Sequence, residues 1–330
     1  MSGDFATGEL RVPAHCAGRR LDQVLAALLP DYSRAHLQRC IRDGGVTVNG
    51  VVRPPKERLQ GGETIRITGL ESDSPRQEDP AQAMALDIVH EDECLLVLNK
   101  PPGLVMHPAA GNPDGTLVNA LLHHDPALRA LPRAGIVHRL DKDTSGLLVV
   151  ARNARAHAHL VAELQDRRVE REYLAVVCGC VIGGGRVEAP IGRHPLDRKR
   201  MAVVSNGKPA VSHYRVEARY RAHTLLRVKL ETGRTHQIRV HMAHRHHPLL
   251  GDPVYGGRPR PPPGADAALA ALLQDFSRQA LHAIRLALTH PDGRFLHWEA
   301  PPPADMQALL TALCEDTRGH HEHHEQHDRS

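Results

Sequence analysis

The chain of 330 residues contains no long apolar run, and this absence limits where the protein can reside. No segment approaches the roughly eighteen consecutive apolar residues that a membrane helix needs. The first ten residues include acidic side chains and lack the apolar core of a signal peptide. We therefore expect a cytoplasmic protein that does not bind a membrane.

Cysteine is also sparse, which argues against a disulfide scaffold or a zinc finger. Of six cysteines only Cys178 and Cys180 lie close in sequence, and no second pair completes a zinc site. Histidines crowd 236–247 and the C-terminal tail, but no His-Glu-x-x-His spacing occurs. We expect reduced thiols and no metal.

Two further signatures are missing. The sequence has no P-loop and no Gly-x-Gly-x-x-Gly after a strand-like run, so a nucleotide cofactor has no support. Ser145 lies outside any Gly-x-Ser-x-Gly sequence, which disfavours a serine hydrolase.

Apolar residues make up 41% of the chain, enough to bury the core of one large domain and a smaller one. The net charge is +4, and arginine greatly outnumbers lysine. Because a guanidinium binds phosphates and stacks on bases, this composition leans towards nucleic acid, although many metabolic enzymes are equally basic.

Composition also divides the chain. Residues 71–83 are rich in Ser, Asp, Pro, Gln and Glu without apolar periodicity, which indicates a linker. We expect one domain at 10–70 and another at 84–315. The His-rich tail at 316–330 is nearly devoid of apolar residues and is expected to be disordered.

The first domain combines helical and strand periodicity. Apolar residues at helical spacing begin at Leu21, and Ser33 is a plausible N-cap for a second helix. Asn49-Gly50 between two Val-rich runs predicts a hairpin. The polar side chains form either a solvated face or an RNA-binding surface, and include Arg19, Arg20, Arg34, His36, Arg39, Arg42, Arg53, Lys56 and Arg58.

The second domain alternates strand-like runs with few helices, which predicts an α+β fold on a large mixed or antiparallel sheet. Strands are expected at 95–99, 146–151, 173–178, 212–217, 224–230 and 281–288, and helices at 116–123, 154–167, 235–246 and 265–277.

Residues 138–146 carry reactive side chains and lie between two apolar runs of the sequence. Arg139 and Asp141 are two residues apart, so an extended backbone places them on one face, where they could address a common ligand. A surface ion-pair cluster would have the same sequence. The short side chains from Asp143 to Gly146 suit a turn held by its own backbone.

A second constellation runs from Thr232 to His244. Thr235 is a plausible N-cap, and the helix after it would place His236 and Arg239 on the packing side. A buried arginine needs an anion, and Asp141 is the natural candidate. That pairing would favour an ionised carboxylate, ready to act as nucleophile or base.

Three ordered motifs resemble those of the RluA-type pseudouridine synthases: residues 138–146, residues 171–175 and residues 232–241. Residues 20–22, 33–34 and 46–50 resemble an S4 RNA-binding domain. The resemblance implies a pseudouridine synthase domain preceded by a small S4-like α/β domain.

In that family the enzyme detaches uracil from ribose and rejoins it through carbon without a metal or organic cofactor. The resemblance assigns the essential aspartate to Asp141, its ion-pair partner to Arg239, and a base-stacking tyrosine that could relay a proton to Tyr173. Asp141 could attack C1′ or C6 or remove a proton from C2′. Without the resemblance, Tyr173 would be a half-buried strand aromatic.

The resemblance also implies an RNA partner. The target uridine must leave the stack, and Arg139 could fill its place. Further RNA contacts are expected from His138, Arg34, Arg39 and Lys56. We expect a monomer acting on uridines in helix 69 of 23S rRNA. The alternatives are a synthase that acts on a different rRNA loop, and a protein that is chiefly an RNA-binding ribosome-assembly factor.

Overall fold

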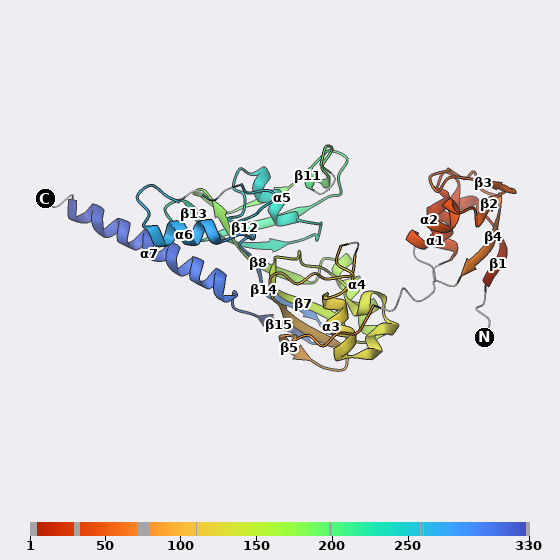
Figure 1. Cartoon of the computed structure of the whole chain (residues 1–330), viewed down its shortest axis with the longest axis horizontal. Helices are drawn as coiled ribbons and strands as arrows, with labels where there is room; N and C mark the ends of the chain where they lie inside the picture. Colours follow the sequence, from red (N-terminus) through yellow and green to blue (C-terminus); the bar gives the residue numbers. More distant parts are fainter. Residues whose placement is uncertain are drawn as a thin grey trace. The chain divides into compact units, whose positions relative to one another are not determined.

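The computed structural model describes residues 5–29, 34–71, 79–109, 111–197, 200–257, 259 and 261–327. The chain forms two compact units, Met1–Asp79 and Pro80–Ser330 (Figure 1). Most of the expected linker and the expected cap Ser33 lie outside the described residues. Among the helices in these ranges, none has the length and apolar character required to cross a membrane.

Unit 1 is a four-stranded antiparallel sheet with two helices. The strands lie in the order β1, β4, β2, β3. The elements are β1 Phe5–Arg11, η1 Ala14–Cys16, α1 Leu21–Leu28, α2 Arg34–Arg42, β2 Val46–Val48, β3 Val51–Val52 and β4 Thr64–Glu71. Strand β1 was not predicted, because its sequence has no apolar alternation.

The hairpin predicted at Asn49-Gly50 is confirmed. Strands β2 and β3 pair antiparallel across it, and both turn residues have positive φ, 50° and 79°. Asn and Gly tolerate this conformation, which the tight two-residue turn requires. The Asn49 side chain also accepts a 2.9 Å hydrogen bond from the Thr64 amide, so the turn is tied to β4.

Unit 2 is an α+β domain built on a nine-stranded mixed sheet, as expected. The order is β5, β6, β7, β14, β8, β13, β12, β9, with β15 also paired to β14. The strands are β5 Ile88–Glu91, β6 Leu95–Lys100, β7 Ser145–Ala151, β8 Glu170–Cys178, β9 Gly185–Glu188, β12 Val211–Arg219, β13 His223–Leu230, β14 Leu281–Thr289 and β15 Phe295–Glu299. A separate hairpin pairs β10 Ile191–Arg193 with β11 Met201–Val203.

Helices cover both faces of this sheet (Figure 1). They are α3 Leu117–His124, α4 Ala154–Gln165, α5 Gln237–His244, α6 Ala267–Asp275 and α7 Ala304–His327, with short turns η2 Pro126–Ala130 and η3 Pro132–Gly135. Leu96 and Leu98 of β6 pack with α3, whereas Leu95 and Val97 pack with α4. This alternation produces two cores, one on each side of the strands.

Strand β8 has the same alternation and determines where the functional residues lie. Tyr173 belongs to the core that includes α3, Leu140 and Ile238 of α5. Its neighbour Leu174 faces the opposite side and packs with α6 and α7. The side of the sheet that carries Tyr173 is therefore the side to which the loop around Leu140 and helix α5 contribute.

The prediction of a disordered tail is wrong for the described part of it. Helix α7 runs from Ala304 to His327 and extends away from the domain (Figure 1). Its first half is anchored by Met306, Leu309 and Leu313, all buried. Because nucleation is the costly step of helix formation, an anchored helix can continue through polar residues that make no core of their own.

Candidate active site

The loop that carries Asp141 lies between the bridge residue Ile136 and strand β7. Ile136 pairs with Val150, and Leu140 is buried in the core. The chain then turns, with the Thr144 amide donating to the Asp141 carbonyl at 3.1 Å. Leu140 therefore anchors the loop, while the Asp141 side chain keeps 15% of its surface exposed.

A buried lysine holds this loop in place. Lys100 is 1% exposed, and its Nζ donates to the carbonyls of Pro101, Leu104 and Lys142 at 2.7, 3.1 and 2.9 Å. Burial lowers the pKa of Lys100 to about 8, although the charges of Asp143 and Asp141 oppose the shift. Lys100 thus fixes the backbone one residue after Asp141.

The turn after Asp141 has a structural role, as expected, but its side chains do not hold it through hydrogen bonds to its own backbone. Thr144 and Ser145 are buried and bond distant side chains, Gln279 at 3.0 Å and His282 at 3.0 Å, rather than their own backbone. Gly146 has φ 110°, and a Cβ there would lie 2.3 Å from the Ala283 carbonyl oxygen. The motif therefore docks the loop against β14.

Arg239 lies between two carboxylates. Its Nη1 donates to Asp141 Oδ2 at 3.0 Å, while Nε and Nη2 donate to Asp252 at 2.7 and 2.9 Å. The side chains of Arg239 and Asp252 are 5% and 0% exposed. Burial alone would lower the pKa of Arg239, but Asp252 and then Asp141 raise it overall. The expected pairing of Arg239 with Asp141 is thus present.

The start of helix α5 differs from the prediction. The N-cap is His236, which adopts φ 56°, and not Thr235, so His236 is not on the helical face that holds Arg239. Its Nδ1 instead meets the Tyr255 hydroxyl at 2.8 Å, and its Nε2 lies 3.9 Å from Asp141 Oδ1. Burial lowers the pKa of His236, which favours the neutral ring beside the carboxylate.

Tyr173 lies in the same core, within electrostatic reach of the carboxylate. Its side chain is 5% exposed. Burial raises the pKa of Tyr173, and the charge of Asp141 raises it further, whereas Arg171 opposes the shift. The phenol therefore stays protonated at neutral pH and can donate a hydrogen bond.

His138 and Arg139 lie in different surroundings. Arg139 is exposed and free to meet a ligand. The His138 Nε2 accepts a 3.1 Å hydrogen bond from the Val149 amide, and Nδ1 is buried without a hydrogen-bond partner among the described residues, so neither ring nitrogen is left for the expected RNA contact. Burial, with a smaller contribution from Arg171, lowers the pKa of His138 to about 3. His138 therefore braces the loop against β7.

The low pKa of His138 predicts acid sensitivity. As the pH falls from 6.5 towards 3, the unfolded chain takes up a proton at this ring that the folded chain does not, so stability falls with pH. We expect His138→Gln to make the thermal midpoint less dependent on pH in this window. Unfolding followed by the fluorescence of the single tryptophan, Trp298, measures this effect, and parallel pH profiles for the two proteins would contradict it.

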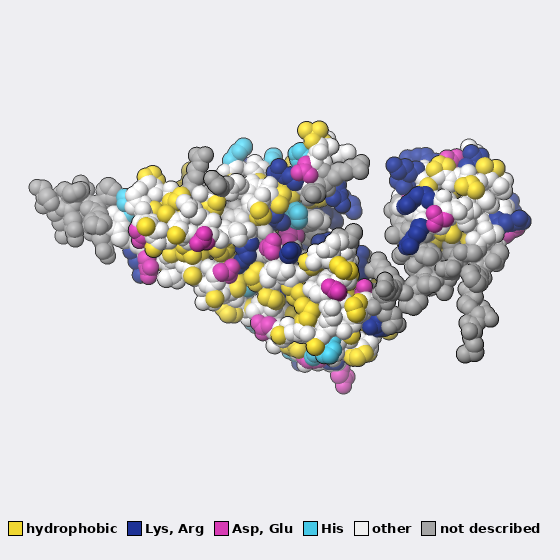
Figure 2. Space-filling view, in the orientation of Figure 1, with side chains coloured by type: hydrophobic (Ala, Val, Ile, Leu, Met, Phe, Trp, Pro, Cys, Tyr) yellow, Lys and Arg dark blue, Asp and Glu magenta, His cyan; other side chains and the backbone are white. Residues whose placement is uncertain are grey.

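Unit 1, considered by itself, has a basic surface. Arg39 and Lys56 are exposed, whereas the side chain of Arg34 lies outside the described set. In Figure 2, Lys and Arg side chains outnumber acidic ones on the visible face of this unit. The exposed set also includes Arg19, Arg42, Arg53 and Arg58. Such a surface suits phosphate contacts.

Comparisons with known proteins agree with this geometry. The family described as RNA pseudouridylate synthase matches residues 94–244, and the S4 domain matches residues 19–65. Ribosomal large subunit pseudouridine synthase D of Escherichia coli K12 is 54% identical over 305 residues, which cover 92% of this chain and 93% of that protein. The protein of the same name from Pseudomonas aeruginosa is 55% identical over 315 residues, covering 95% and 98%.

The chain belongs to the RluA-type family of pseudouridine synthases. It is an isomerase with an N-terminal S4 domain. Solved structures agree: human RNA pseudouridylate synthase domain containing 1 is 27% identical with a TM-score of 0.54, covering 71% of this chain and 89% of its own.

Sequence reasoning did not assign three residues to this pseudouridine synthase site. They are Lys100, Asp252 and Tyr255, each of which contacts the loop, Arg239 or His236. Their roles depend on contacts between distant segments of the chain. Charge balance indicates that a buried guanidinium can bind two carboxylates, but it does not select Asp252 among the acidic residues.

Proposed function

We propose that this synthase isomerises specific uridines of large-subunit ribosomal RNA, with Asp141 as the reacting carboxylate. The observation that carries the proposal is the single bond from Arg239 to one oxygen of Asp141. Asp252 occupies the other two guanidinium nitrogens. Asp141 Oδ2 is thereby fixed, while Oδ1 has His236 at 3.9 Å and is available to a substrate.

The reaction breaks the bond between C1′ and N1 of uridine and forms one between C1′ and C5, releasing the C5 hydrogen as a proton. An ionised carboxylate can attack C1′ or C6, or can remove the C2′ proton, and each route begins from the same charged group. The hydrogen bond from the arginine keeps Asp141 oriented.

Tyr173 and Arg139 complete the proposed site. The Tyr173 ring stacks on the detached uracil, and its protonated hydroxyl passes a proton to or from the base. Arg139 is exposed two residues before Asp141, so its guanidinium can enter the stack that the flipped uridine leaves.

Tyr173→Phe separates stacking from proton transfer. The substitution keeps the ring in the core but removes the hydroxyl, so the fold and RNA affinity should be preserved. We expect the single-turnover rate to fall by about 10² if the hydroxyl relays a proton. An unchanged rate would restrict Tyr173 to packing and stacking. Tryptophan fluorescence during thermal unfolding checks that the domain is intact.

The substrate follows from the relatives and the basic unit. Relatives that cover nearly the whole chain are named as synthases of the ribosomal large subunit, and unit 1 offers exposed Arg39 and Lys56 for phosphate contacts. We propose 23S rRNA as the partner and the helix 69 stem-loop as the target. The side chains of unit 1 would add affinity without choosing the base.

Tritium release tests this substrate choice. RNA labelled at C5 of uridine loses its label when the new carbon bond forms. We expect release from 23S rRNA and from an isolated helix 69 stem-loop, and none from a helix 69 variant with the loop uridines replaced. If 23S rRNA with the same helix 69 uridines replaced still released tritium, the enzyme would act on another rRNA loop.

A further inference from the structure

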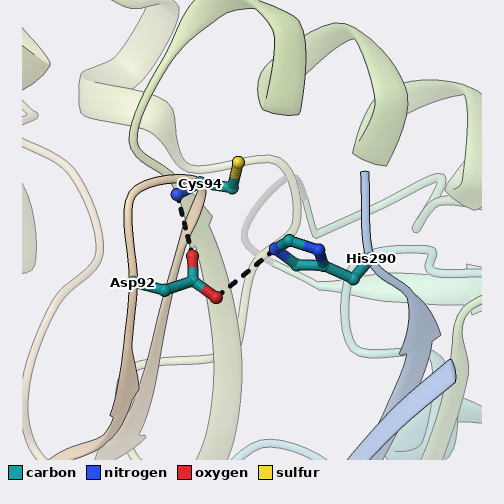
Figure 3. Close-up of side chains that lie close together, drawn as sticks. All are labelled: Asp92, Cys94 and His290. Atoms are coloured by element: carbon teal, nitrogen blue, oxygen red, sulfur yellow. Dashed lines mark hydrogen bonds and ion pairs between the residues drawn. The ribbon is translucent and has the colours of Figure 1, made fainter. Parts of the chain in front are cut away.

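Three potential metal ligands meet at the end of the sheet opposite the Asp141 loop. Asp92 and Cys94 lie in the turn between β5 and β6, and His290 follows β14. One donor atom from each lies within 4.8 Å of the others. Figure 3 shows the Asp92 carboxylate and the His290 ring pointing toward each other from separate chain segments.

This cluster is distant from the loop described above. In the pairing of β6 with β7, Leu95 lies beside Ala151 and Lys100 lies beside Gly146. Five strand steps separate the two ends, which is roughly 17 Å at 3.3 Å per residue. The cluster is thus separate from the Asp141 site and does not depend on the proposed function.

His290 supplies the observation that favours an ion. The residue is 5% exposed, and its Nε2 makes no hydrogen bond of good geometry with a described residue, although it lies 3.3 Å from Asp92 Oδ2. Two ligand atoms on one tetrahedral zinc would be about 3.4 Å apart, given bonds of about 2.0–2.1 Å. The His290 and Asp92 atoms already have this separation.

The opposite nitrogen of His290 is oriented as metal-binding histidines usually are. Its Nδ1 lies 2.8 Å from an oxygen of the Asp292 carboxylate and accepts a 3.2 Å hydrogen bond from the Asp292 amide. Metal binding at Nε2 requires the other tautomer, in which Nδ1 carries the proton and donates it to that carboxylate oxygen in place of accepting from the amide. A carboxylate behind a metal-binding histidine fixes the tautomer and strengthens the ligand.

The backbone orients the remaining donors. Asp92 Oδ1 accepts from the amides of Cys94 and Leu95 at 2.8 and 2.7 Å, so Oδ2 is the oxygen left for His290. That oxygen also meets His90 Nε2 at 2.9 Å. Cys94 is half-buried and its sulfur meets only Asn153 at 3.8 Å among the described contacts, so a small side-chain rotation can close the triad.

We propose that Asp92, Cys94 and His290 bind one divalent transition-metal ion of the zinc class, joining the β5–β6 turn to the β14–β15 turn. A thiolate, an imidazole and a carboxylate together select zinc or cobalt over magnesium or calcium. Sequence spacing could not reveal this site, because its ligands come from opposite ends of the catalytic unit. It would correct the expectation that no cysteine serves a metal.

Cobalt absorption tests the site in the full-length chain. A thiolate bound to Co²⁺ gives a near-ultraviolet charge-transfer band. The His-rich tail contains no cysteine and therefore cannot produce this band. We expect a band that saturates at one equivalent, is lost in Cys94→Ser, and requires at least about tenfold more cobalt in His290→Gln. Cys180→Ser, which changes an exposed thiol elsewhere, is the matched control and should keep the band.

Thermal unfolding gives an independent readout. Excess Zn²⁺ should raise the midpoint reported by Trp298 by about 5 °C in the wild type and not in Cys94→Ser. Absence of the cobalt band in the wild type would overturn the proposal. So would a band that persists in Cys94→Ser, or a zinc shift of the same size in both proteins.

Discussion

Asp141→Asn is expected to abolish pseudouridine formation while leaving the fold and RNA binding intact. Asparagine has the same shape and can still accept the 3.0 Å hydrogen bond from Arg239, but it cannot act as an anionic nucleophile or base. We expect the single-turnover rate of tritium release to fall by at least about 10³. Affinity for 23S rRNA, measured at fixed salt, should change little.

Asp143→Asn is the matched control for this change. Asp143 lies two residues away in the same loop. Its backbone carbonyl accepts a 3.2 Å hydrogen bond from Arg278, and this bond does not involve the side chain that the substitution changes. Its side chain has no assigned chemical role, so activity should remain within a few-fold of the wild type. If both variants lost activity equally, disruption of the loop would explain the result better than loss of a reacting carboxylate.

Arg239→Met should cause the largest loss of stability. The change removes the two hydrogen bonds that the guanidinium donates to the fully buried Asp252, which keeps only those from the Val254 and Tyr255 amides, and leaves Asp141 without its partner. Removal of one member of a buried ion pair costs about 3–5 kcal/mol. We therefore expect the Trp298 unfolding midpoint to fall by about 10 °C and activity to be lost.

The double variant Arg239→Met with Asp252→Leu separates stability from catalysis. Replacing both buried partners with apolar side chains removes the unpaired charge, so much of the lost stability should return. Activity should stay absent because Asp141 still lacks the arginine that orients it. Recovery of activity together with stability would show that Arg239 only maintains the fold.

The sequence predicted elements whose signals are local. The Asn49-Gly50 hairpin follows from turn chemistry, and six of the nine strands of the main sheet follow from apolar runs, whereas β5, β9 and β15 were not predicted. The position of Arg239 on a packing face followed from helical spacing, even though the helix begins after His236 rather than after Thr235. A left-handed residue at a helix start has no clear sequence signal outside Gly and Asn.

Features that depend on distant contacts could not be predicted in the same way. Asp252 was expected neither as a second partner of Arg239 nor as a buried carboxylate, and Lys100 reads as an ordinary basic residue at a strand end. The helical tail was missed because polar composition was read as disorder, whereas Met306 and Leu309 anchor a helix that continues through it. Tertiary packing decided each case.

Mapping pseudouridine in 23S rRNA tests the central claim most directly. Ribosomal RNA would be compared between cells lacking this gene, cells restored with the wild-type chain, and cells restored with Asp141→Asn. The account predicts that helix 69 uridines stay unmodified in the deletion and in the Asp141→Asn cells, and are modified with the wild type. Pseudouridine restored by Asp141→Asn would contradict the assignment of Asp141 as the reacting carboxylate.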